Sequence, residues 1–163
     1  MMMKYIKISL GIFLVLASSR LIPHPPNFTS LMAVSFYVPA ILGLKFIPSL
    51  IISFAITDLI IGFHSSVFFT WGSVIIIGFI AKYFTNSIFS RIFGALSGAV
   101  IFFLVTNFGV WFGGMYSQNF NGLIESYVMG LPFFGYNLIS TFLFSAVIES
   151  VIKFIKFRVG YFS

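Results

Sequence analysis

Apolar residues dominate the chain in long runs, and most polar positions fall between them. Several runs approach the roughly 20 residues with which an α-helix crosses the core of a bilayer. The pattern predicts six helical spans, at about residues 5–19, 30–44, 46–63, 67–83, 92–113 and 132–152. The second is short, since about 15 residues at 1.5 Å each cover only about 22 Å. It would tilt little, begin earlier, or lie shielded inside the bundle.

The segments between the spans are short, which predicts a single transmembrane domain over residues 1–163. The exception is the polar stretch Met115 to Leu131. We expect an outer loop there, with a short helix that lies at the membrane interface and caps the bundle.

Composition supports a membrane protein. Hydrophobic residues make up 60% of the chain and charged residues 7%, whereas soluble domains usually carry about 25% charged residues. The predicted fold class is therefore all-α, a compact polytopic bundle of six transmembrane helices. The net charge of +6 comes from single residues near span ends, so nucleic-acid binding is not expected. The absence of cysteine excludes disulfides and thiolate metal sites.

The basic residues predict the orientation, because short cytoplasmic loops are enriched in Lys and Arg. With the N-terminus inside, the cytoplasmic ends hold Lys4, Lys7, Lys45, Lys82, Arg91, Lys153, Lys156 and Arg158. Both termini are then cytoplasmic, in a multi-pass protein of the cell inner (cytoplasmic) membrane. An alternative is that the first segment is a signal peptide, cleaved near Ala17-Ser18-Ser19.

Arg20 is the basic residue that this orientation leaves outside. It opens a run with three prolines, Arg-Leu-Ile-Pro-His-Pro-Pro-Asn-Phe, from Arg20 to Phe28. Proline fixes the backbone, so the first helix should end near Leu21 and the following turn should be stiff. Asn27 or Thr29 would cap the second helix. Arg20 and His24 then serve either as parts of a rigid hairpin or as contacts to a ligand.

Asp58 lies about five residues before the outer end of the third span. A carboxylate there is costly to insert and faces the bundle or a cavity, where it finds a partner. Arg20 is the expected partner. Their pair would lock the first helix to the third, with or without lining a pocket.

Four further residues complete the outer set. Asn107 and Trp111 lie four apart, on one face of the fifth span. His64 and Glu125 are also placed outside by the predicted topology. The two histidines match no metal motif by spacing, and no pattern of an enzyme site is present. We expect no cofactor, no metal site and no catalysis.

Three motifs carry a resemblance to a bacterial family of small integral membrane proteins without an established function. They are the run from Arg20 to Phe28, the segment from Ser53 to Asp58 followed by Gly62-Phe63-His64, and the segment from Thr106 to Trp111. In size, span number and topology the chain is also similar to the substrate-binding S-components of energy-coupling-factor vitamin transporters. That similarity implies a vitamin pocket near the outer face, a transmembrane coupling subunit and ATPases as partners. Many S-components dock through alanines four apart on helix one, where this chain has Gly11 and Val15.

The sequence therefore predicts a membrane component that binds a vitamin or micronutrient for uptake, with the lipid bilayer and a small-molecule ligand as partners. Arg20 would face an anionic group of the ligand. The predicted substrate-binding residues are Arg20, His24, Asn27, Asp58, His64, Asn107, Trp111 and Glu125. The alternative is a non-catalytic structural subunit of a larger membrane complex.

Overall fold

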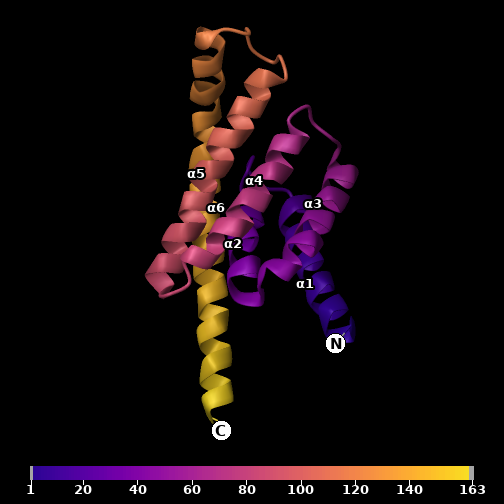
Figure 1. Ribbon diagram of the computed structural model, residues 1–163, viewed down its shortest axis with the longest axis vertical. Helices are drawn as coiled ribbons and strands as arrows, with labels where there is room; N and C mark the ends of the chain where they lie inside the picture. The colour runs from indigo at the N-terminus through magenta and orange to yellow at the C-terminus, as the bar shows by residue number, and fades with distance from the viewer. Residues whose placement is uncertain (1, 162–163) are drawn as a thin grey trace.

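The computed structural model describes residues 2–161, with side chains through Phe157. The regular structure of residues 2–161 is helical, without a strand. Six α-helices and two 3₁₀ turns follow one another (Figure 1): α1 (Met2–Leu21), α2 (Leu31–Leu42), η1 (Leu44–Phe46), α3 (Ile47–Ile61), α4 (Val67–Ile80), η2 (Ala81–Tyr83), α5 (Ile88–Phe112) and α6 (Phe120–Tyr161).

Four segments are long and apolar enough to cross a membrane: Met2–Leu21, Leu44–Ile61, Ile88–Phe112 and Phe120–Phe157. Two shorter apolar segments, Leu31–Leu42 and Val67–Tyr83, complete the set. Their large apolar side chains are widely exposed, for example Phe68 at 78% and Phe89 at 85%. Since such a surface is poorly tolerated in water, these helices are those of a membrane protein.

Helix α2 lies at the centre of the bundle, which explains its short length. Eight of its residues are buried, and Ala33, Ser35 and Phe36 are fully inaccessible. It packs against α5, α4 and α6 and also touches α1 and α3. Of the three explanations for the short second span, the structure supports shielding by the surrounding helices.

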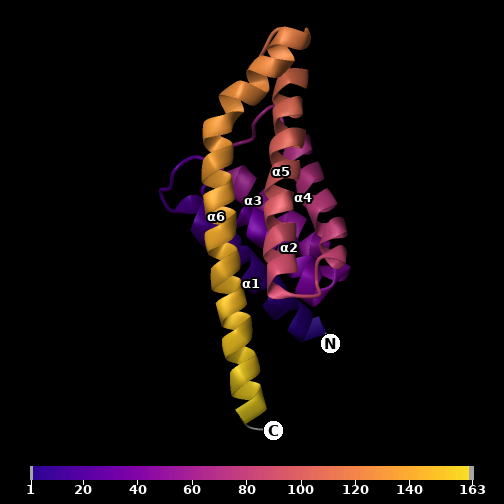
Figure 2. The same ribbon diagram turned by 90° about the vertical axis from the view of Figure 1, so that its left-hand side faces the viewer.

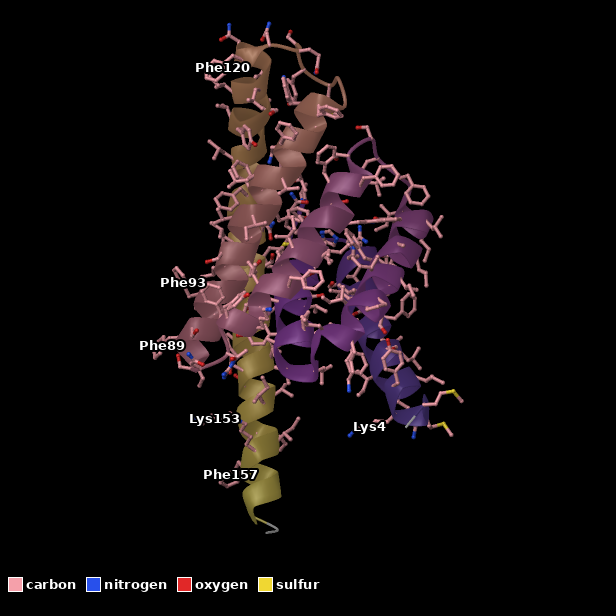
Figure 3. The ribbon with its side chains drawn as sticks, in the orientation of Figure 1. Lys4, Phe89, Phe93, Phe120, Lys153 and Phe157 are labelled. Carbon is pink, nitrogen blue, oxygen red and sulfur yellow. The ribbon has the colours of Figure 1, made fainter. Side chains whose placement is uncertain are left out.

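The two ends of the bundle differ in chemistry. Figure 1 shows both termini at the lower end and the α5–α6 connection at the upper end. Lys4 and Lys153 lie toward the lower end and Phe120 at the upper end, while Phe89 and Phe93 project outward from the lower part of α5 (Figure 3). Two of the basic side chains, Lys4 and Lys153, thus lie toward the end that holds the termini.

Helix α6 differs from the prediction. It runs without interruption from Phe120 to Tyr161, so most of the segment expected to form a loop with an interfacial helix is the first part of α6. The loop itself spans only residues 113–119. Pro132 lies inside the helix, and the upper part of α6 bends (Figure 2), as expected where proline removes a backbone hydrogen bond. The 42 residues cover about 63 Å.

Two glycines of α5, Gly94 and Gly98, let the central helices approach one another closely. A Cβ on Gly94 would lie 2.5 Å from Cε2 of Phe36 and 2.7 Å from Cβ of Phe84, and one on Gly98 would lie 3.0 Å from Ile77. Since Phe36 is completely buried, α5 contacts α2 closely only because position 94 has no side chain.

We expect Gly94→Ala to destabilise the protein by about 1–3 kcal/mol, because overpacking forces buried neighbours to move. The measurement is thermal unfolding of purified protein in detergent. Gly72→Ala is the matched control, since a Cβ there meets nothing within 4 Å and alanine favours helix over glycine. Equal melting temperatures for the two variants would contradict the close contact of α5 with Phe36.

Candidate functional site

The proline turn between α1 and α2 forms one edge of the site. Helix α1 ends at Leu21, as the prolines predict. Asn27 adopts a left-handed backbone conformation, with φ at 60°, which asparagine tolerates better than most residues. Its backbone oxygen accepts a hydrogen bond from Ser140 of α6. The turn is therefore anchored to α6. Of the two residues expected to cap α2, Asn27 and Thr29, it is Thr29 whose Oγ1 accepts from the Leu31 amide, at 3.3 Å.

Arg20 reaches from α1 to α3. Its Nη2 donates to Oδ1 of Asp58 at 2.6 Å, which confirms the predicted ion pair. Its Nη1 donates to the backbone oxygen of Phe54 and to Oγ1 of Thr57, and the guanidinium lies 4.4 Å from the centre of the Phe54 ring. One side chain thus contacts successive turns of α3.

Asp58 is closed off behind this guanidinium. It is 1% exposed, and its second oxygen, Oδ2, accepts from Nε1 of Trp71 at 2.7 Å. Trp71 lies on α4, so the carboxylate joins α1, α3 and α4. The sequence analysis did not single out Trp71 or Thr57, although Thr57 directly precedes Asp58 in the chain.

A cavity of about 470 Å³ lies beside this cluster, between the proline turn, the α3–α4 loop, α5 and α6. This end of the bundle is opposite to the termini. Five of the predicted site residues line the cavity: Arg20, His24, Asn27, His64 and Asn107. The volume lies within the usual range of small-molecule pockets.

The other three predicted residues do not line the cavity. Asp58 is covered by Arg20. Trp111 donates from Nε1 to the Ser117 oxygen at 3.0 Å and so holds the α5–α6 loop. Glu125 is exposed on α6, because the segment predicted as a covering loop is helical and turns this carboxylate away.

The other residues that line the cavity were not among the predicted substrate-binding residues. Six aromatic side chains form much of the wall: Phe54, Phe102, Phe103, Tyr116, Phe133 and Phe134. Asn137 of α6 also lines the cavity while being only 4% exposed. The sequence does not show which of its 24 phenylalanines line a cavity. An asparagine inside an apolar span, by contrast, was a recognisable sign of a buried polar site.

The histidines occupy the open edge of the cavity. Both nitrogens of His24 contact backbone oxygens, of Pro25 at 2.7 Å and Arg20 at 3.2 Å, and Nδ1 of His64 lies 3.0 Å from Oγ of Ser66. Among the described residues, no three His, Cys, Asp or Glu side chains gather as a metal-ion site. The histidines help to shape the turns that border the cavity.

A second polar cluster lies near the opposite end of the bundle. Arg91 of α5 forms a bidentate pair with Glu149 of α6, through Nε to Oε1 at 2.6 Å and Nη2 to Oε2 at 2.7 Å. The hydroxyl of Tyr37 in α2 donates to Oε1 at 2.9 Å. This pair joins three helices, and the sequence analysis did not identify Glu149.

A buried polar stripe on α6 connects the level of this pair with the cavity. Asn137, Thr141, Ser145 and Glu149 follow at intervals of four and are 4%, 0%, 0% and 7% exposed. Because residues four apart share one helix face, this pattern was the available sequence signal for Glu149 and Asn137.

Comparison with known proteins gives a family. The sequence profile of a family of unknown function (DUF6580) matches residues 2–161. No curated protein and no solved structure shows significant similarity to the chain. Because the profile matches nearly the whole chain, the protein belongs to the DUF6580 family.

Proposed function

We propose that the protein binds a small molecule at the outer face of the bacterial inner membrane, as the substrate-binding component of an uptake transporter. The observation that carries the proposal is the cavity of about 470 Å³ beside Arg20. It combines an apolar, aromatic wall with a few fixed polar groups, which is the usual composition of small-molecule sites.

The charge pattern supports the orientation. Lys4, Lys7, Lys45 and Lys82 are exposed, and Lys4 lies toward the end of the bundle that holds the termini (Figure 3). Positive charge favours the cytoplasmic side, so six helices would cross the bilayer with both termini inside. The cavity then opens outward, where it can capture a nutrient.

The proposed partners follow from the similarity to S-components. Such a binding protein works with a transmembrane coupling subunit and ATPases, and it carries out no covalent chemistry itself. A shallow apolar groove lined by Gly11, Val15 and Val34 lies on α1 and α2. Gly11 is the position where α1 departs from the alanine pattern of many S-components, so the coupling partner here would meet a different surface.

Native mass spectrometry of the full-length protein, purified gently from the membranes of its own cells, tests this proposal. A bound small molecule, or a complex with a second membrane subunit and ATPases, is the expected result. Protein that carries neither, and that takes up no added vitamin, would contradict it.

A structural subunit of a larger complex is the alternative, and one observation favours it. Arg20 and Asp58 lock α1 to α3 with the carboxylate 1% exposed, which serves a scaffold as well as a pocket. In that case other membrane subunits co-purify and the cavity stays without a ligand.

Filling the cavity distinguishes the two functions. We expect Thr106→Trp to abolish retention of the co-purifying ligand, because Thr106 lines the cavity and is only partly buried. Leu104→Trp is the matched control on the same helix, since Leu104 is 48% exposed and does not line the cavity. The measurement is ligand content by mass spectrometry at equal folded protein. Equal ligand content in both variants would exclude this cavity as the binding site.

A further inference from the structure

We propose that the ligand of this cavity is an uncharged ring compound that carries amide groups, such as a lactam, imide or carboxamide. The inference rests on the proposed binding function and adds the chemical class of the ligand. It replaces the anionic ligand expected from the sequence.

Charge balance is the first argument. Arg20 is the residue of fixed charge in the described lining of the cavity, and Asp58 already neutralises it at 2.6 Å. An anion would have to displace this carboxylate or leave a net negative charge between the aromatic side chains of the wall. Both are costly, because an uncompensated charge in a low-dielectric interior is strongly unfavourable.

A cationic ligand lacks a partner as well. Asp58 is 1% exposed, and its oxygens are engaged by Arg20 and Trp71. Glu125 is exposed outside the cavity. No carboxylate belongs to the described lining, so an ammonium group inside would stay unpaired. A neutral ligand satisfies the charge balance as it stands.

The free polar groups define the second argument. Asn137 accepts from Thr141 through Oδ1, while its Nδ2 has no partner among the described residues. Asn107 donates from Nδ2 to the Phe103 oxygen, while its Oδ1 accepts no hydrogen bond from the described residues. Nδ2 of Asn137 is therefore a free donor, and Oδ1 of Asn107 is a free acceptor.

Arg20 adds further donors. A guanidinium has five N–H groups, and three are directed at Phe54, Thr57 and Asp58, which leaves two for a ligand carbonyl. An amide or lactam edge presents both C=O and N–H, so it matches the free acceptor and donors together. An ester or ketone would satisfy the donors alone.

The wall supplies the third argument. Phe103 of α5 and Phe134 of α6 stack with ring centres 4.6 Å apart, and both line the cavity. Aromatic walls pack flat ring systems well, by offset stacking or by edge-to-face contact. A flat ring with amide edges therefore fits the aromatic wall and the polar groups together.

Matched probes test the charge of the ligand. Purified full-length protein is titrated with nicotinamide, nicotinate and 3-picolylamine, and with biotinamide and biotin, while melting temperature and tryptophan fluorescence are recorded. We expect the uncharged amide of each set to bind at a concentration at least tenfold lower than its charged analogues. Any small molecule that co-purifies is identified by mass spectrometry, and it should be uncharged at pH 7.

Two variants test the role of Asp58. In Asp58→Asn the charge of Arg20 is no longer balanced, so the preference should shift at least tenfold toward the carboxylate probes. In the double variant Arg20→Gln/Asp58→Asn the site is neutral again, and the preference for amides should return. If Asp58→Asn does not fold, the double variant carries the test, and a preference for carboxylates there would overturn the proposal.

The outcomes separate the two proposals. A charged probe that binds wild-type protein as tightly as its amide, or a charged co-purifying ligand, overturns the ligand class and leaves the binding function standing. Protein that binds no probe and carries no small molecule refutes the binding function, and the inferred ligand class falls with it.

Discussion

Glu149→Ala is expected to destabilise the protein by about 3–5 kcal/mol, the loss typical of a buried ion pair deprived of one partner. Glu149 and Arg91 have side chains only 8% and 16% exposed. Removing the carboxylate leaves the guanidinium without its bidentate acceptor and the Tyr37 hydroxyl without its acceptor. Because α2, α5 and α6 meet at this carboxylate, the loss should affect the whole bundle.

Thermal unfolding in detergent, followed by circular dichroism, measures the effect. Glu125→Ala is the matched control, since it removes the same side chain from the same helix at an exposed position. It should change stability by less than about 0.5 kcal/mol. The double variant Arg91→Met/Glu149→Met should recover much of the loss, because replacing both partners removes the unpaired charge. A Glu149→Ala protein as stable as Glu125→Ala would show that the pair does not hold the helices together.

Arg20→Ala is expected to destabilise the protein more than Asp58→Ala, although both break the same ion pair. Asp58 is 1% exposed, so its charge would stay buried with Trp71 as the remaining donor. The expected loss is about 3–5 kcal/mol. In Asp58→Ala the Arg20 guanidinium keeps its contacts with Phe54 and Thr57 and can be hydrated from the cavity, because its side chain is partly exposed and lines that cavity. The helix C-terminus also favours a cation.

The comparison uses melting temperatures of the two variants in one detergent, with Lys4→Ala as the control for an exposed cation. Tryptophan fluorescence supplies a second readout, since both variants alter the surroundings of Trp71. If Asp58→Ala proves less stable than Arg20→Ala, the unpaired Arg20 guanidinium is not hydrated. The cavity is then less open to solvent than its lining indicates.

Local chemistry made part of the fold predictable. The prolines after Arg20 fixed the end of α1 at Leu21, since proline acts through its own backbone. The cost of a carboxylate inside an apolar span predicted a partner for Asp58, and Arg20 was the available cation. By contrast, Glu125 and the covering loop were misplaced, because polar residues on the exposed side of a long helix resemble those of a loop.

The sequence by itself determined the class of protein, the approximate helices and the pairing of Arg20 with Asp58, since hydropathy, proline and isolated charge act over a few residues. Only the tertiary structure decided that α2 is shielded, that Trp71 closes off Asp58, and that a cavity lies beside the pair. These features arise where helices distant in sequence meet. Packing there depends on shape, and in a chain with 24 phenylalanines hydrophobicity alone does not say which of them line a cavity.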